Sequence, residues 1–169
     1  VPNALQDPIL ELHDGTGAVL TSNDDWKLPQ QAAVEATGLA PPDDRESAIL
    51  LSLQPGSYTV IESGKNGTTG NGLIEVYDID TLSTSQLSNI STRGRVQTGN
   101  NAMIGGFVVS GASGSVNLIV RVLGPTLTSF GVANALSDPT LQLFDGNGTV
   151  IAFNNNWKDM QQTQIQNSG

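Results

Sequence analysis

The segment Asp7–Asn23, DPILELHDGTGAVLTSN, predicts a β-hairpin. Two short apolar runs, Ile9–His13 and Ala18–Ser22, flank the turn sequence DGTG at positions 14–17. Aspartate and glycine are favoured in tight turns, because aspartate accepts hydrogen bonds from the nearby backbone and glycine adopts positive φ angles. Strand-like runs on both sides of such a turn are the usual signal of a hairpin. We therefore expect two antiparallel strands at this point of the chain.

The same pattern returns 131 residues later. Aligned at this fixed offset, residues 1–38 and 132–169 share 18 identities in 38 positions without a gap. The matched residues include the two tryptophans, Trp26 and Trp157. A period of 131 is far longer than the roughly 20 to 50 residues of solenoid repeats, so each repeat is a whole domain. The sequence thus holds one full period and the first 38 residues of another.

The repeat predicts the domain organisation. We expect residues 1–130 to form one complete sandwich and residues 131–169 to begin the next repeat, homologous to residues 1–38. The segment 81–91 is rich in serine and threonine and poor in apolar residues, which is typical of a linker. It is the expected natural seam between repeats. A longer tandem array and a protein whose end echoes its beginning both remain open.

Further segments have the composition of strands separated by turns with glycine or proline. The expected strands are Ala48–Leu53, Ser57–Glu62, Leu73–Asp78, Arg93–Gln97, Met103–Ser110 and Val116–Leu123. Residues 28–37 are expected to form a loop with one or two helical turns, stopped by Gly38. One period therefore holds about eight strands. We predict an all-β fold, an antiparallel β-sandwich of the jelly-roll kind, because two packed sheets hide edges that a flat sheet exposes.

Composition narrows the class of function. The chain of 169 residues has 7 Lys+Arg and 16 Asp+Glu, a formal charge of −9, and no basic cluster. Nucleic acid is therefore not an expected partner, because contacts to phosphates need concentrated positive charge. No apolar run approaches the roughly 20 residues that span a bilayer, so no membrane insertion is expected. With no cysteine and one histidine, His13, the chain is not expected to be an enzyme.

Oxygen-bearing side chains gather in the predicted loops. Asp14, Asn23, Asp24 and Asp25 lie in two neighbouring loops, and Ca²⁺ takes six to eight oxygen ligands. The alternative is that these side chains form Asx turns at the ends of the hairpin. In the second copy asparagine replaces both Asp24 and Asp25, which removes the charge that tight calcium binding needs. We expect at most weak calcium binding and no other cofactor.

Trp26 and Trp157 each follow a loop of asparagine and aspartate. A tryptophan exposed in such a loop can stack on a sugar ring, and both residues are candidates for this role. The alternative is a core anchor whose indole N–H reaches a loop carbonyl, which the small number of aromatic residues favours. His13 is replaced by Phe144 in the second copy, so a position on a strand explains it better than a catalytic base.

Four segments of the first period resemble the bacterial pre-peptidase C-terminal domain. They follow its order of strand, Asp-Gly turn, acidic loop and Pro-Gly-x-Tyr, and they are Asp7–Gly15, Asn23–Asp25, Leu53–Val60 and Gly72–Tyr77. The resemblance covers about half of the chain. It implies a secreted, non-catalytic β-sandwich appended to enzymes or surface proteins, in a family whose members bind calcium in some cases.

A second resemblance spans the whole period. The segments that carry it are Asp43–Ile49, Gly64–Gly70, Asn89–Val96, Ile104–Phe107 and Arg121–Pro125. They are similar to a tandem repeat domain of large exported proteins of environmental bacteria, for which no activity is implied. This resemblance implies location and architecture rather than chemistry.

We therefore predict a non-catalytic structural or adhesive repeat, extracellular or at the cell surface, that builds a stalk or filament. If residues 1–130 complete one sandwich, the second hairpin has no partner strands left. It is expected to pair head to tail with another copy or an adjacent repeat, through Leu141, Leu143, Val150, Ile151 and Trp157. The alternative is a carbohydrate- or matrix-binding accessory module of a secreted enzyme, with polysaccharide as its partner.

Overall fold

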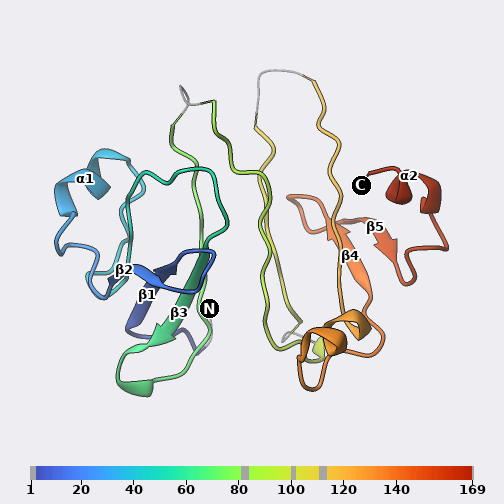
Figure 1. Ribbon diagram of the computed structural model, residues 1–169, viewed down its shortest axis with the longest axis horizontal. Helices are drawn as coiled ribbons and strands as arrows, with labels where there is room; N and C mark the ends of the chain where they lie inside the picture. Colours follow the sequence, from blue (N-terminus) through green and yellow to red (C-terminus); the bar gives the residue numbers. More distant parts are fainter. Residues whose placement is uncertain (1–2, 81–83, 100–101, 111–113, 169) are drawn as a thin grey trace. The chain divides into compact units, whose positions relative to one another are not determined.

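The computed structural model describes residues 3–80, 84–99, 102–110 and 114–168. The chain divides into two compact units, Val1–Ile90 and Ser91–Gly169 (Figure 1). The division falls at the end of the serine- and threonine-rich segment 81–91, of which residues 81–83 lie outside the described residues. The expected sandwich limits at residues 130 and 131 stay a prediction.

The described residues form two small antiparallel sheets and a few short helices. The first unit contains β1 (Pro8–His13), β2 (Val19–Asn23), α1 (Gln31–Ala36), β3 (Thr59–Gly64) and the 3₁₀ helix η1 (Lys65–Gly67). The second unit contains the 3₁₀ helix η3 (Pro125–Phe130), β4 (Leu141–Phe144), β5 (Val150–Asn154) and α2 (Gln162–Gln166). The prediction of a β-rich fold is confirmed.

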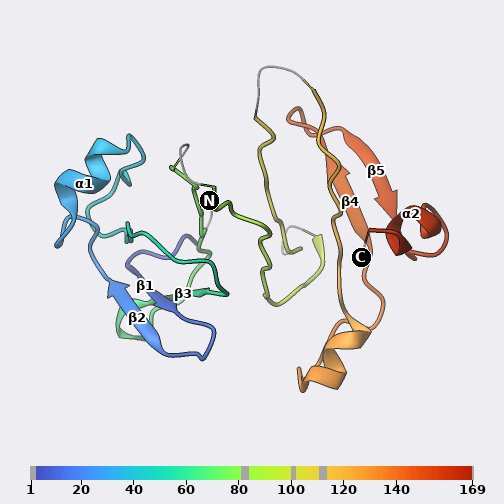
Figure 2. The same cartoon turned by 45° about the horizontal axis from the view of Figure 1, so that its top comes forward.

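The first sheet has the order β2-β1-β3, with β1 in the middle (Figure 2). β2 runs antiparallel to β1 with Leu10 opposite Asn23. β3 runs antiparallel along the other edge of β1, with Pro8 opposite Gly64. Leu12 lies in the middle strand and is only 4% exposed to solvent. The buried residue of β1 therefore lies where β2 and β3 pair with its two edges.

The turn between β1 and β2 is held by its own aspartate. The Asp14 carboxylate Oδ1 accepts hydrogen bonds from the backbone N–H of Thr16 at 2.8 Å and of Ala18 at 3.0 Å. Gly17 has a φ of 87°, a left-handed conformation that a side chain disfavours. The turn chemistry expected from the sequence therefore closes the hairpin, with a β-bulge at the end of β1.

The second hairpin reproduces the first. β4 pairs antiparallel with β5, with Leu141 opposite Asn154, and its register shifts between Leu143 and Phe144, at the position matching the bulge in β1. Asp145 Oδ1 accepts backbone hydrogen bonds in this turn as Asp14 does in the first. Within the residues that the structure describes, this sheet has only two strands, so β4 has no counterpart of β3 on its other edge.

Of the six further strands that the sequence predicts, Ser57–Glu62 is found, two residues later, as β3. The segments 48–53, 73–78, 93–97, 103–110 and 116–123 are all described, and no strand is assigned to them. Extended chain becomes a strand only where a neighbour supplies the ladder of hydrogen bonds. The described residues therefore do not form a clear eight-stranded sandwich. Apolar side chains such as Ile104 and Val108 remain 87% and 91% exposed.

The core of the first unit is small, and its buried apolar side chains are Leu12, Trp26 and Val34. Val34 is contributed by α1, which forms within the loop where one or two helical turns are expected. After α1 the chain turns at Gly38, whose φ is 74°. Across the described ranges, no helix has the length and apolar character needed to span a membrane.

Replacing Leu12 by alanine should destabilise the first hairpin much more than replacing Leu143 destabilises the second. Leu12 is buried between two strands, and removing a buried leucine side chain costs about 2 to 4 kcal/mol. Leu143 is only half-buried in a two-stranded sheet, so its loss should cost less. Hydrogen exchange read separately on peptides from each hairpin measures both effects. Equal destabilisation of the two hairpins would show that pairing with β3 does not stabilise the first hairpin.

Candidate functional site

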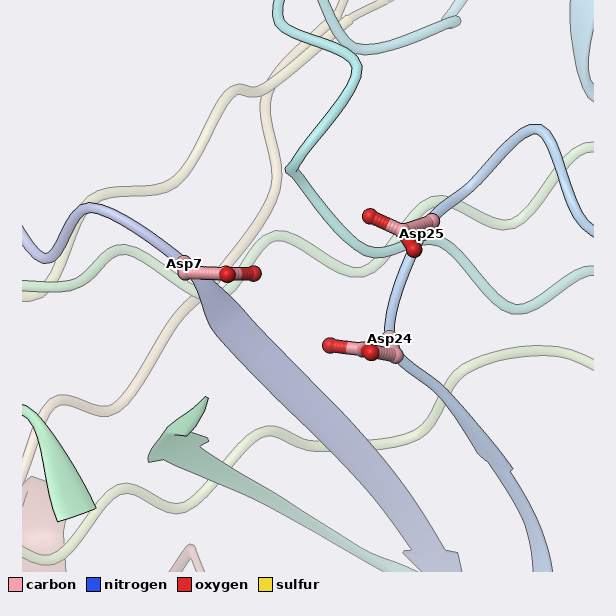
Figure 3. A group of neighbouring side chains, drawn as sticks. All are labelled: Asp7, Asp24 and Asp25. Atoms are coloured by element: carbon pink, nitrogen blue, oxygen red, sulfur yellow. The ribbon is translucent and has the colours of Figure 1, made fainter. Parts of the chain in front are cut away.

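Three carboxylates of the first unit lie together. Asp7 directly precedes β1, and Asp24 and Asp25 directly follow β2. One oxygen from each side chain lies within 4.8 Å of those of the other two. Figure 3 shows the side chains of Asp7 and Asp24 pointing toward one another. This group, which we call the acidic cluster, is the one place in the described part of the chain where three acidic side chains lie close enough together to share a metal ion.

The register of the hairpin explains why these residues meet. With Leu10 opposite Asn23, the residue before β1 is brought beside the residues after β2. Asp7 is therefore a site residue that the sequence reasoning missed. The signal was present, because extending the register of the predicted hairpin past its strands places Asp7 near Asp24, and because Asp7 recurs as Asp138.

A lysine already supplies positive charge to the acidic cluster. Lys65 Nζ lies 2.6 Å from Asp24 Oδ2 and 3.8 Å from Asp7 Oδ2. The hydrogen bond to Asp24 raises the pKa of Lys65, which keeps it protonated. The other carboxylate oxygen of each partner, Asp7 Oδ1 and Asp24 Oδ1, is buried and has no hydrogen-bond partner. The cluster can attract a cation, but with one oxygen from each carboxylate it offers three of the six to eight oxygen ligands that Ca²⁺ takes.

Asp14 and Asn23, expected beside Asp24 and Asp25 as calcium ligands, have other partners. Asp14 accepts hydrogen bonds from groups of its own turn, and these bonds, first of all the one from the Thr16 hydroxyl, lower its pKa. Asn23 is buried, and its amide Nδ2 donates to the carbonyls of Asp25 and Leu28. The structure therefore brings Asp24 and Asp25 together with Asp7 rather than with Asp14.

The histidine is held within the first hairpin. His13 Nδ1 lies 3.1 Å from the carbonyl of Gly17, and Nε2 lies 3.2 Å from the Glu11 carboxylate. The hydrogen bond with Gly17 is the main cause of its raised pKa. Both ring nitrogens thus contact neighbouring residues of β1 and its turn, as a position on a strand implies.

Three side chains after β1 anchor a distant segment, Asp43–Leu50. Trp26 Nε1 donates to the carbonyl of Asp43 at 3.0 Å, and Asn23 Oδ1 accepts from the N–H of Ala48 at 3.0 Å. Gln30 pairs with the backbone of Leu50 on both sides, donating from Nε2 at 2.7 Å and accepting at Oε1 at 3.1 Å. We call Asn23, Trp26 and Gln30 the anchor residues. They hold the long loop against the first sheet.

The two tryptophans differ in exposure. Trp26 is only 5% exposed to solvent, so its ring packs in the core and is not open to a ligand. Trp157 is 46% exposed and remains a candidate for stacking on a ligand. Each ring has the following lysine over its face, with Nζ of Lys27 and Lys158 at 5.5 and 5.3 Å from the ring centroid. The two tryptophans therefore have the same lysine contact but differ in burial.

The residues expected to mediate assembly lie on the second hairpin and beyond it. Leu141 and Leu143 of β4 are half-buried, whereas Val150 and Ile151 of β5 are exposed. Trp157 follows β5 and is exposed. The structure places these five residues on one short stretch of the second unit, with substantial apolar surface in contact with solvent.

Two small hollows of the first unit have volumes of about 210 and 180 Å³. The first is lined by Glu62 and by the glycines Gly64, Gly70 and Gly72. A side chain at Gly72 would clash with the Glu62 carboxylate, so this glycine permits the close packing. Burial raises the pKa of Glu62. Both hollows are smaller than the roughly 300 to 1,000 Å³ of small-molecule sites.

Comparison with protein-family models, with curated proteins and with solved structures gave no match to this chain.

Calcium should have little effect on the natural sequence. Because Lys65 already lies between Asp7 and Asp24, 1 mM Ca²⁺ is expected to change the melting temperature by less than about 1 °C relative to EDTA. Differential scanning calorimetry measures the shift. Lys65→Gln removes the competing cation and should increase the response. A calcium-dependent rise of about 5 °C or more in the natural sequence would show a well-formed site.

Acid should loosen the loop that Trp26 anchors. The Arg45 guanidinium and backbone N–H lower the pKa of Asp43 from 3.8 to about 2. The pKa of Asp43 is lower in the folded state than in the unfolded state, so its ionised carboxylate stabilises the folded loop. This stabilisation is fully present above pH 3.8 and is lost as the pH falls through about 2.

Arg45→Gln should move the titration of Asp43 upward toward 3.8, because the main hydrogen-bond donor is removed. Carboxyl-carbon NMR gives this pKa directly. Asp44→Asn, which removes a neighbouring carboxylate that pairs with Lys27 rather than with Arg45, is the control. An unchanged Asp43 pKa in Arg45→Gln would exclude Arg45 as its cause.

Proposed function

We propose that this chain is a non-catalytic repeat module of an exported bacterial protein, which assembles head to tail by strand or hairpin donation. Its place is extracellular or at the cell surface, and its role is structural or adhesive in a stalk or filament. Its partners are copies of itself or adjacent repeats. The observation that carries the proposal is a second hairpin that copies the first, without a third strand in the described residues.

The repetition extends from sequence to local structure. Asn3 and Asn134 have left-handed φ angles of 54° and 56°, and the turn glycines Gly17 and Gly148 have 87° and 81°. α1 and α2 follow the hairpins at matching positions. Such agreement in turn geometry, bulge and helix supports two copies of one module rather than two unrelated segments.

Exposed apolar surface supports assembly. In the segments 103–110 and 116–123, most large apolar side chains are more than two fifths exposed. Single exposed apolar residues are normal, but a run of them along a chain marks a surface that another element covers. We propose that each complete repeat covers these segments in an antiparallel sandwich of about eight strands, as the resemblance to pre-peptidase C-terminal domains implies.

The alternative is a carbohydrate- or matrix-binding accessory module of a secreted enzyme. Trp157 favours it, because its indole ring is exposed beside Asn154, Asn155 and Asn156. Aromatic rings next to amide side chains are suited to sugars, which offer an apolar face and hydroxyl groups. Trp26, buried in the matching position, favours the structural role of this tryptophan.

The full chain should self-associate as its concentration rises, and deletion of residues 131–169 should abolish the association. The deletion removes the hairpin whose sheet has only two strands among the described residues. Sedimentation velocity measures the change. Leu143→Asp should weaken association without a deletion, and Thr126→Asp, at an exposed position of η3 outside the hairpin, is the control. A full chain that stays monomeric at high concentration, or a truncated chain that still assembles, would contradict the proposal.

A further inference from the structure

His13, the last residue of β1, has a hydrogen-bond acceptor at each of its two ring nitrogens. Nδ1 lies 3.1 Å from the carbonyl oxygen of Gly17 in the turn, and Nε2 lies 3.2 Å from Oε2 of Glu11. A neutral imidazole carries a proton on one nitrogen only, so it can donate to one of these two acceptors. An imidazolium donates from both nitrogens. The surroundings of His13 therefore match the charged form of its side chain.

The strands on both sides of β1 place no other charge against this ring. The residues opposite His13 are Val19 of β2 and Thr59 of β3, and neither titrates. β2 has no titratable side chain, and β3 has one, Glu62. Glu62 is three positions along β3 from the partner of His13, so strand alternation places it on the other face of the sheet. The charges that act on the ring come from its carboxylate partner on β1 and from Asp14 in the turn, and both are negative.

The second hairpin has the same turn but lacks this pair of contacts. Its turn glycine and its bulge repeat those of the first hairpin. At the positions that match Glu11 and His13 it has Gln142 and Phe144. Both members of the pair are replaced together, and neither replacement carries a charge. Since the second turn closes without them, the pair is not needed to form the hairpin, and it adds a dependence on pH.

We propose that His13 is a pH-sensitive clasp, which in its imidazolium form ties the end of β1 to the turn and which releases one contact when the ring becomes neutral. The charged ring donates to the Gly17 carbonyl and to the Glu11 carboxylate together. When one proton leaves, one ring nitrogen presents a lone pair to an oxygen, and that contact is lost. The Glu11 side chain is 43% exposed, so its carboxylate has water as the alternative partner. This inference goes beyond the proposed function and does not depend on it.

The clasp is closed at mildly acidic pH and open at alkaline pH. The hydrogen bond with Gly17, with smaller contributions from Glu11 and Asp14, raises the pKa of His13 above 6.5 against the opposing effect of desolvation. Because the folded-state value is the higher one, the stabilisation is fully present below pH 6.5 and is lost as the pH rises through the folded-state value. The second hairpin, with Phe144 at this position, has no such dependence.

NMR titration of the His13 ring is the direct measurement, since the chain contains one histidine. We expect a pKa above 6.5 in the folded chain. Glu11→Gln introduces the residue type of the second copy and should lower the pKa of His13, because it removes a negative charge beside Nε2. Glu35→Gln is the control, because this carboxylate lies on α1 and bonds to Gln31.

Two matched amides test whether the clasp acts on the hairpin. The N–H of Asp14 donates to the carbonyl of Ala18 at 3.0 Å, and the N–H of Asp145 donates to that of Thr149 at 2.9 Å. Hydrogen exchange gives the protection of each amide relative to an unstructured peptide at the same pH. Between about pH 5.5 and about pH 8.5, the protection of Asp14 relative to Asp145 should fall by about two- to threefold, as for one partly exposed charged contact.

The variant His13→Phe completes the test. Phenylalanine stands at the matching position of the second hairpin, which is folded, so the variant is expected to fold. Its ratio of protection should be independent of pH. A His13 pKa at or below 6.5, a His13 pKa that Glu11→Gln leaves unchanged, or an equal pH dependence of the ratio in His13→Phe would overturn the clasp.

Discussion

The first unit depends on the hydrogen bonds by which Asn23, Trp26 and Gln30 hold the backbone of residues 43–50. These bonds join segments about twenty residues apart and bring β3 to the open edge of β1. Buried amide and indole groups are costly unless they are paired, so the anchor residues and the loop require one another. A hairpin, which alone is marginally stable, thereby becomes a three-stranded sheet with a small core.

Local features were predictable from the sequence. The two hairpins, their Asp-Gly turns and the helical turn before Gly38 depend on neighbouring residues, and the structure contains them. The strands expected at 73–78, 93–97, 103–110 and 116–123 depend on partners far along the chain. Their apolar composition indicates that they need covering, but it does not specify which edge each one meets. Composition therefore gave the β-rich class, and it could not give the pairing.

The acidic cluster illustrates the same distinction. Counting acidic residues in adjacent loops grouped Asp14 with Asp24 and Asp25, although Asp14 lies at the opposite end of the strands. The hairpin register, which the turn already determines, brings Asp7 to Asp24 instead. Lys65 follows β3, so its position depended on a long-range pairing that no local pattern contains. The meeting of Asp7 with Asp24 could thus be predicted from the hairpin, whereas the position of Lys65 could not.

Two copies in one chain separate what local sequence determines from what long-range contacts determine. Turn conformation, bulge and the lysine over the tryptophan ring are the same in both copies, so the local sequence determines them. Burial of Leu12 and Trp26 is not reproduced at Leu143 and Trp157, so it depends on the long-range contacts that residues 43–64 make with the first hairpin. The hairpin therefore has the same form with a third strand beside it and, in the described residues, without one. A surface that is folded but not yet covered is the condition for accepting a strand from another repeat.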